Sequence, residues 1–367
     1  MSTDIRIEHI YNNQEFANLQ ENWDRLHSQS PIRDAFLTWE WLWTWWKHYS
    51  QNKDLWLTTA WQGEQLAGIA PLMLIKKRKY GQTFRILKAL GAPDCDISGF
   101  LVHNGNECIL QALCDFIISQ QKHWDAIELD EFHNDDPQTL FVIKYFQKFS
   151  FDTLKIVKDH YYLPIESDWP TYFNNISGNT RNDVKRRIRR AEENGKLSYE
   201  RVAGEEVKWE HFQTIFKINA AGHYPDLYAK NLERAFHHDL MERMHKLGLI
   251  EMYFLWFDEK PVAFRYGFAF EGKFEDWRNG VDMNFNQLSA GKILLKMTLE
   301  DHFNRGYREF DFLRGIDEYK ARWQPQKRQF ASIRITHKKN IRATIAFTFL
   351  PKFKKLLQNE INKRISK

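Results

Sequence analysis

The same order of secondary structure elements occurs twice along this chain. In each half, the hydrophobic pattern predicts a strand, two helices, a meander of strands, a helix and a strand. The hairpins TTAWQGEQLAGIAPL and YFLWFDEKPVAFRYG, one in each half, share an aromatic residue, a tight turn and small apolar residues after it. The repeat is one of architecture rather than of sequence. It predicts two similar domains within the 367 residues.

The predicted class is α/β, in the sense of an α+β fold with mixed sheets. Each domain is expected to be a mostly antiparallel mixed sheet flanked by helices, because most strands are joined by short turns. Helices are expected at residues 13–29 and at residues 36–49, the latter apolar almost all round and therefore buried. The expected boundaries are 1–165 for the first domain, 166–337 for the second and 338–367 for a basic C-terminal tail.

Three cysteines at irregular spacing, Cys95, Cys108 and Cys114, give neither a disulfide framework nor a zinc site. No signal peptide and no apolar run of membrane-spanning length is present, so we expect a cytoplasmic protein without a metal. After His337 there are nine basic residues and one acid. This tail can form an amphipathic helix with Phe353, Leu356, Leu357 and Ile361 on one side, which predicts either packing on the body or peripheral contact with the inner, anionic face of the membrane.

The stretch LSAGKILLKMTLEDHFNRG predicts a helix whose beginning can hold an anion. Ser289 is a candidate N-cap for a helix that starts at Ala290. Gly291 in the first turn allows a ligand to approach the backbone, and Lys292 adds positive charge. The alternative is a well-capped core helix without a ligand, carried by its apolar residues. The stretch is not a Walker loop, because the earlier glycine and the hydroxyl residue after the lysine are missing.

A second basic element is TRNDVKRRIRRAEENGK, which predicts a helix that ends at Gly195. Arg186, Arg189 and Arg190 share one face at helical spacing and could bind the phosphates of a nucleotide, a coenzyme or RNA. The alternative is a solvated helix face that nearby acids balance.

Four carboxylates lie on the meander and the last strand of the second half: Glu275, Asp276, Glu309 and Asp311. One of them could accept a proton from a nucleophile, although each could equally be an outward-facing strand residue. Because side chains alternate along a strand, Glu275 and Asp276 face opposite sides.

Two stretches resemble a known family. FLTWEWLWTWWKHY is similar to the Trp-rich helix of the CelD/BioF2-like acyltransferases, a branch of the GNAT superfamily, and LSAGKILLKMTLEDHFNRGYREFDFLRGIDEYKARW is similar to their late signature. Ala290 stands where that family usually has proline. The chain also resembles the FemABX aminoacyl transferases, which have tandem GNAT-like domains, in its basic helix and in the pair Tyr319-Lys320.

The resemblance implies acyl transfer from acetyl-CoA or another acyl-CoA to a small-molecule or sugar-linked amine, for example an amino sugar of the cell envelope or of exopolysaccharide biosynthesis. It implies that residues 289–292 bind the pyrophosphate and that the strand at Asp276, Trp277 and Arg278 holds the acyl carbonyl. It also implies that Lys320 stabilises negative charge, either on the tetrahedral intermediate or on a substrate phosphate. It also implies that tryptophans of the first domain, such as Trp41 and Trp45, help to build the acceptor site.

Two other functions are compatible with the sequence. The first is a transferase that takes its acyl group from aminoacyl-tRNA, in which the basic helix and the tail contact RNA; otherwise we expect no nucleic-acid partner. The second is a basic binding module for nucleic acid or anionic lipid without enzymatic activity. Lys320 itself is either a surface charge or a residue of the site. In the second case, the sequence predicts a large loss of turnover in Lys320→Ala with little loss of stability.

Overall fold

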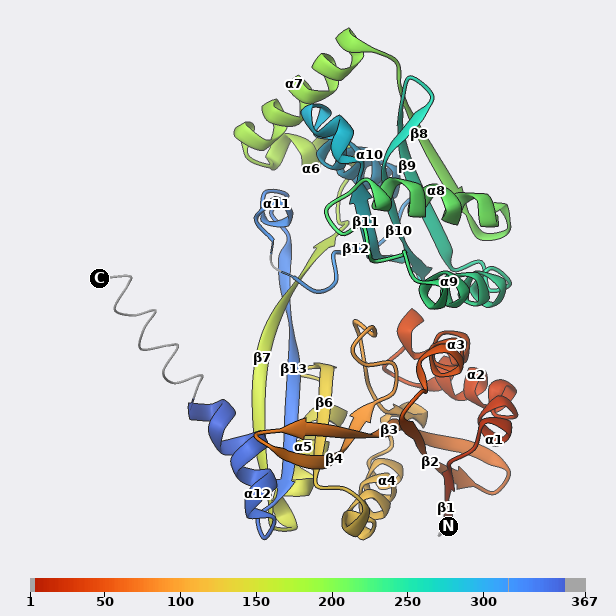
Figure 1. The fold of residues 1–367 in the computed structure, drawn as a ribbon, viewed down its shortest axis with the longest axis vertical. Helices are drawn as coiled ribbons and strands as arrows, with labels where there is room; N and C mark the ends of the chain where they lie inside the picture. The colour runs from red at the N-terminus through yellow and green to blue at the C-terminus, as the bar shows by residue number, and fades with distance from the viewer. Residues whose placement is uncertain (1–3, 316, 354–367) are drawn as a thin grey trace. The chain divides into compact units, whose positions relative to one another are not determined.

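The computed structural model of the protein describes residues 4–315 and 317–353, which form two compact units. The first unit consists of residues 4–158 and 329–353, and the second of residues 159–328 (Figure 1). The second unit thus begins a little before the expected boundary at 166. The segment 329–337, expected in the second domain, belongs to the first unit, because its strand pairs there.

The first unit is built on a mixed sheet in the order β1-β2-β3-β4-β6-β13-β7. Its strands are β1 Ile5–Ile10, β2 Lys53–Gln62, β3 Gln65–Lys79, β4 Gln82–Ala89, β6 Ala126–His133, β7 Phe151–Pro164 and β13 Gln326–His337, with the short β5 Leu101–Val102 beside β3. Its longer helices are α1 Asn13–Ala17, α2 Gln20–Gln29, α3 Trp39–Tyr49, α4 Glu107–Ser119 and α5 Pro137–Lys148. β4 and β6 pair in parallel, whereas β1 with β2, β2 with β3, β3 with β4 and β6 with β13 pair antiparallel.

The second unit repeats this arrangement in the order β7-β12-β11-β10-β9-β8. Its own strands are β8 Leu197–Ala203, β9 Ile250–Phe257, β10 Lys260–Phe270, β11 Lys273–Val281 and β12 Glu309–Asp311. Its helices are α6 Trp169–Asn175, α7 Gly178–Asn194, α8 Trp209–Ala220, α9 Asn231–Met244, α10 Ala290–Asn304 and α11 Glu318–Ala321. Again one pair, β11 with β12, is parallel, and the other described pairs are antiparallel.

The two units exchange their last strands. β7 follows the helix α5 of the first unit, but its final residues pair with β12 of the second unit, as in Leu163 opposite Phe310. β13 follows the second unit in sequence, but it pairs with β6 of the first unit, as in Ile333 opposite Leu129. Each sheet is therefore completed by a strand that comes from the other half of the sequence.

Several expected elements differ in detail from the structure. The helix expected at 13–29 is interrupted near Asn18, which gives α1 and α2. The Trp-rich helix begins at Trp39, because Thr38 caps it by accepting a hydrogen bond from the Trp41 amide at 3.3 Å. Strand β13 was not predicted, since its first residues are polar and give no clear period.

The two faces of the second sheet are covered by different helices. Phe274 on β11 packs in the core cluster that includes residues of α10. On the opposite face of the sheet, the Trp277 ring contacts the His237 ring of α9, with 5.6 Å between the ring centroids. Side-chain alternation along β11 thus separates an α10 face from a face covered by α8 and α9.

A buried carboxylate fixes the end of α10 to the sheet. Glu251 on β9 is 2% exposed and accepts hydrogen bonds from Arg201 at 2.6 Å, from Arg305 at 2.9 Å and from the Tyr307 hydroxyl at 2.8 Å. Burial alone would raise the pKa of Glu251, but hydrogen bonds from His302, Arg305 and Tyr253 hold it well below its usual range. The network joins β8, β9 and the end of α10, and so helps to position the whole helix.

The beginning of the expected tail packs on the first unit. Residues 341–353 continue as a helix, with α12 at Ile341–Ala343 followed by a π-helical turn at Thr344–Phe349. Phe347 is fully buried in a small cluster with Phe84 and Ile86. Leu356, Leu357 and Ile361 lie outside the described residues. No helix within residues 4–315 and 317–353 is both long enough and apolar enough to span a bilayer.

Candidate active site

The candidate site lies in the second unit, where the parallel strands β11 and β12 stop pairing. Their ladder covers three residue pairs, from Lys273 opposite Glu309 to Glu275 opposite Asp311. β11 continues to Val281, beyond the last pair. Ligands of α/β proteins commonly bind beyond the carboxyl ends of parallel strands. Asp276, Trp277 and Arg278, which the resemblance assigned to the acyl carbonyl, follow directly after the paired segment.

Asp276 lies in a buried ion pair at this position. Arg265 of β10 donates from Nε to Asp276 Oδ1 at 3.1 Å and from Nη2 to Oδ2, and both residues are at most 3% exposed. The Arg265 guanidinium also interacts with the hydroxyl of Tyr319, whose pKa is raised by burial and partly lowered again by Arg265. Since both Asp276 oxygens are bound to Arg265, the carboxylate acts as its counter-ion, and this differs from the sequence-based role of a proton acceptor.

Lys320 is buried beside this pair. It is 4% exposed, and its Nζ donates to the backbone carbonyls of Phe312 at 3.0 Å, Arg314 at 2.8 Å and Gly315 at 3.4 Å. Burial lowers the pKa of Lys320, and the carboxylates of Asp276 and Asp317 partly offset this. Lys320 is therefore no surface charge. It fastens the turn after β12 and places a positive charge near Asp276.

Glu275 and Asp311 belong to a separate charged group. Glu275 is fully buried and pairs with Lys273. Asp311 accepts from Arg328 at 3.1 Å and from the Leu313 amide at 2.7 Å, and burial raises its pKa. Glu275 and Asp276 face opposite sides of β11, as expected from alternation. The structure therefore brings Asp276, Tyr319 and Lys320 together and leaves Glu275 and Asp311 outside that group.

The beginning of α10 is arranged differently from the expectation. The helix starts at Ala290 and Ser289 is its N-cap residue, as predicted, but Ser289 has φ 55° and its side chain makes no capping hydrogen bond. Its hydroxyl instead accepts a hydrogen bond from Arg187 of α7. Lys292 lies 3.7 Å from Asp183, which also accepts from Arg187 Nε at 2.9 Å. A basic helix is thus joined to the first turn of α10.

Close packing explains the glycine at position 291, in addition to the expected access of a ligand to the backbone. A Cβ atom at this position would lie 3.0 Å from Val281 Cγ1 at the end of β11. This is tighter than ordinary contact, so a larger residue would have to push α10 and β11 apart. The glycine therefore allows the first turn of α10 to approach the strand closely.

A cavity of about 520 Å³ lies beside this junction. Its lining includes three arginines of α7 together with two residues that precede α10: Arg186, Arg187, Arg190, Gln287 and Leu288. Arg190 is exposed, whereas Arg186 and Arg187 are paired with Asp183. Guanidinium groups of this kind bind phosphate oxygens with two parallel hydrogen bonds.

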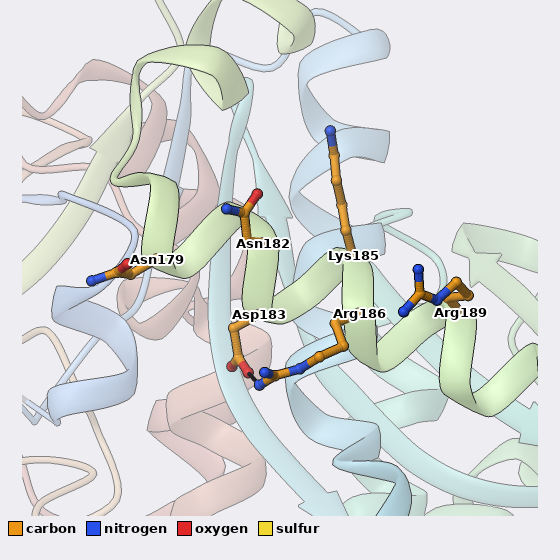
Figure 2. A pocket seen from close by; sticks show the side chains of 6 residues that line it. All are labelled: Asn179, Asn182, Asp183, Lys185, Arg186 and Arg189. Carbon is orange, nitrogen blue, oxygen red and sulfur yellow. Dashed lines mark hydrogen bonds and ion pairs between the residues drawn. The ribbon is translucent and has the colours of Figure 1, made fainter.

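The predicted trio of arginines on α7 does not share one cavity. Arg186 and Arg190 line the cavity beside α10, and Arg186 and Arg189 line a second one of about 510 Å³ with Asn179 and Asn182. Figure 2 shows this second cavity, in which Arg186 reaches toward Asp183 and Lys185 points away from both. Arg189 lies 3.6 Å from Glu193 and is largely exposed. Arg186 and Arg190 therefore adjoin the candidate site, and Arg189 does not share their cavity.

Trp277 and Arg278 form a rigid part of β11. Trp277 is 5% exposed, and the Arg278 guanidinium lies over its ring at 4.3 Å from the centroid. The neighbouring His237 is buried, which together with Arg278 lowers its pKa to about 3 and keeps it neutral. Because these side chains are packed in place, the backbone of β11 is fixed at the position expected to hold the acyl carbonyl.

Trp41 and Trp45 lie in the core of the first unit. They are at most 1% exposed, and Trp45 Nε1 donates to Asp94 at 2.9 Å. Gly91 lies so close to the Trp41 ring that a Cβ there would be 2.7 Å from it. Neither indole therefore presents a face to a ligand in this structure. Trp41 packs against Gly91 and Trp45 is hydrogen-bonded to Asp94, so both support the segment between these two residues.

Two residues of the site were missed by the sequence analysis. Arg265 lies within VAFRYGF, and a single charge inside an apolar strand is a signal for a buried ion pair. Arg187 belongs to the predicted basic helix but lies outside the face that was singled out. Among the described residues, no group of three His, Cys, Asp or Glu side chains is placed to bind a metal.

Comparison with known proteins places this architecture among known folds. Residues 178–321 match the family model of the acetyltransferase (GNAT) domain. The crystal structure of FemX is similar with a TM-score of 0.58 and 13% identity, over 89% of this chain and 96% of that chain. A tandem GNAT protein from the clavulanic acid biosynthesis pathway is similar with a TM-score of 0.50 and 9% identity, over 91% and 99%.

The C-terminal domain of a putative lysylphosphatidylglycerol synthetase from Agrobacterium fabrum is also similar, with a TM-score of 0.53 and 12% identity, over 91% of this chain and 95% of that chain. The comparison of the sequence with curated proteins finds no match. The chain thus has a GNAT-like fold similar to that of FemX, and residues 178–321 of its second unit match the acetyltransferase (GNAT) domain. The expected resemblance and fold class are confirmed.

Proposed function

We propose that the protein is an N-acyltransferase that moves an acyl group from acyl-CoA to an amine. The observation that carries this proposal is the arginine-lined cavity beside the first turn of α10. Its lining includes Gln287 and Leu288, which directly precede α10, and its arginines can hold the phosphates of a coenzyme. As acceptor class we propose a small-molecule or sugar-linked amine, with an amino sugar of the cell envelope or of exopolysaccharides as the first to assay.

The chain's own residues would position and polarise the reactants. The donor supplies a thioester carbonyl. The acceptor nitrogen bonds to that carbon and loses a proton, and the carbon–sulfur bond breaks to release the thiol. Amide groups of β11 after Glu275 are proposed to bind the carbonyl oxygen, and the buried charges of Arg265 and Lys320 lie on the same part of the unit. Fixed dipoles and charges in a site of this kind stabilise negative charge that develops on the oxygen.

Arg190→Glu is expected to weaken acetyl-CoA binding by about 10- to 100-fold, because it replaces a charge-assisted phosphate contact by repulsion. Isothermal titration of acetyl-CoA and of free coenzyme A into the full chain measures this. Arg189→Glu is the matched control, since Arg189 lies on the same helix but lines the other cavity. Equal weakening by both variants, or no binding to the wild-type chain, would contradict the proposed donor site.

Aminoacyl-tRNA is the second candidate donor. The observation in its favour is that exposed cations of α7 line more than one cavity along the helix, which suits a larger polyanion. Under this alternative Arg189→Glu and Arg190→Glu weaken tRNA binding to a similar extent, and binding falls steeply with salt. Cleavage of the acyl-CoA thioester, assayed with candidate amines, separates the acyl-CoA-dependent enzyme from a binding module without activity.

Gly291→Val is expected to weaken acyl-CoA binding more than Lys292→Ala does. The valine would cover the backbone of the first turn and would also press on Val281, whereas Lys292 is partly exposed and already paired with Asp183. Titration of acyl-CoA measures the binding, and a melting curve of each variant reports the strain at Val281. Stronger weakening by Lys292→Ala would show that charge, rather than access to the backbone, holds the ligand.

A further inference from the structure

A stripe of exposed apolar side chains runs along the C-terminal helix of the first unit. Its members are spaced four residues apart: Ile341 is 67% exposed, Ile345 46%, Phe349 61% and Phe353 50%. Residues four apart lie on one side of a helix, and the π-helical turn at Thr344–Phe349 keeps them aligned. We call these four residues the C-terminal stripe. Single exposed apolar residues are ordinary, but four in one row mark a surface that another phase or molecule covers.

The opposite side of the same helix packs on the first unit, so the helix cannot rotate to bury the stripe without losing these contacts. Ala343 and Phe347 are fully buried, and the Phe347 ring meets Phe84 edge-on at 5.1 Å between centroids. The Lys79 ammonium donates to the carbonyl of Ala346 at 2.7 Å and lies 4.3 Å from the centre of the Phe347 ring. The helix is therefore fixed to the first unit by one side and presents the C-terminal stripe on the other.

Positive charge surrounds the stripe. Residues 338–353 contain no acidic residue. Their cations are all exposed: Lys338, Lys339, Arg342 and Lys352. β3 ends in the run Lys76, Lys77, Arg78 and Lys79, and Lys79 ties that end to the helix. The exposed ring of Tyr80 follows at the tip of the hairpin.

A cavity of about 630 Å³ adjoins the beginning of the helix. Lys339 and Arg342 contribute cations to its lining, and Asp125, which is paired with Arg85 at 3.4 Å, contributes a carboxylate. A phosphate group could bind to these cations while the apolar stripe is covered by a non-aqueous phase. The cavity thus adds a site for a headgroup to a surface that already combines apolar side chains with cations.

We propose that this surface docks the protein on an anionic lipid bilayer, with the C-terminal stripe in the boundary between headgroups and acyl chains. Large aliphatic side chains in a row, flanked by lysine and arginine, are the features of helices that lie in a membrane interface. RNA is a poorer fit, since its bases stack on aromatic rings and Arg planes, and half of the stripe is isoleucine. The proposal does not depend on the proposed enzymatic function.

Vesicle sedimentation of the full chain tests the proposal. We expect binding to vesicles of phosphatidylcholine mixed equally with phosphatidylglycerol, no binding to pure phosphatidylcholine, and weaker binding as salt rises. Phe349→Asp should reduce the binding about tenfold or more, because it places a charge in the apolar boundary. Arg342→Ala should reduce it about fivefold, the equivalent of ~1 kcal/mol for one cation near the surface.

The matched control is Tyr11→Asp, which places the same charge on an equally exposed aromatic position elsewhere in the first unit. It should bind vesicles like the wild type. Phe349→Ser is a second variant of the stripe, and circular dichroism melting checks that each variant is folded. Wild-type binding by both Phe349 variants would overturn the proposal. So would binding of polyuridylate with no binding to anionic vesicles, or a stripe-dependent dimer that excludes them.

Discussion

Lys320→Ala is expected to lower the turnover of acyl transfer by about 100-fold or more, the usual cost of removing one group that stabilises a developing oxyanion. The structure adds a second effect that the sequence did not predict. Because Lys320 Nζ donates to the carbonyls of Phe312, Arg314 and Gly315, the variant leaves buried acceptors without their donor. This should lower the free energy of unfolding by about 1–3 kcal/mol. Urea unfolding and acyl-CoA hydrolysis measure the two effects.

Two further variants separate the roles of Lys320. Lys320→Met keeps the length of the side chain without its charge, and Lys320→Arg keeps the charge in a planar group that cannot reach the same three carbonyls. We expect both to remain well below the wild-type rate. Lys327→Ala is the control, because Lys327 is exposed and paired with Asp159. Normal hydrolysis by a folded Lys320→Ala variant would remove Lys320 from the candidate site.

Glu251→Gln is expected to lower the free energy of unfolding by about 3–5 kcal/mol at neutral pH, because two arginines would face a neutral group in a buried position. Glu251 ties β8 and β9 to the end of α10, so the loss should also loosen the helix that begins at the candidate donor site. Urea unfolding measures the loss. Glu205→Gln, at an exposed position, is the control and should change the free energy of unfolding little.

The effect of Glu251 should depend on pH in a defined direction. Its pKa in the folded protein lies well below the value of about 4.3 in an unfolded chain, so the unfolded chain binds the proton more strongly. The stabilisation is fully present above that value and is lost as the pH falls through and below it. The difference in the free energy of unfolding between wild type and Glu251→Gln should therefore shrink as the pH is lowered from about 6 to about 3, a range that includes the pKa of the unfolded chain. A difference that stays constant over this range would contradict the assignment.

Much of the fold follows from local sequence signals. The hairpin turn at Gly63 and the stop of α7 at Gly195 agree with the structure, because each depends on residues that are adjacent in the chain. Strand β13 does not follow from local signals. Its pairing partner β6 is almost 200 residues earlier in the sequence, and its first residues carry polar side chains. Pairing over such a distance leaves little trace in the sequence of one strand.

The candidate site shows the same limit. Lys320 and the turn that it holds are close in sequence, so the sequence could single out this stretch. It could not predict that Arg265 pairs with Asp276, because Arg265 lies on the neighbouring strand, next to a register shift between Tyr266 and Phe268. The hydroxyl of Ser289 could cap its own helix, but the positive φ of that residue turns it toward Arg187 instead. Tertiary contacts override local preference at both places.

The exchange of last strands has a consequence for how the protein is made. Synthesis proceeds from the N-terminus, yet the first sheet is incomplete until β13 at residues 326–337 has been translated. Until then the edge of β6 lacks its partner, and such an edge can pair with other chains. The second half in turn needs the end of β7, which is already present when its own strands emerge. The second sheet can therefore be completed before the first, although it is translated later. If the gene were divided between the two halves, each product would lack one strand of its sheet.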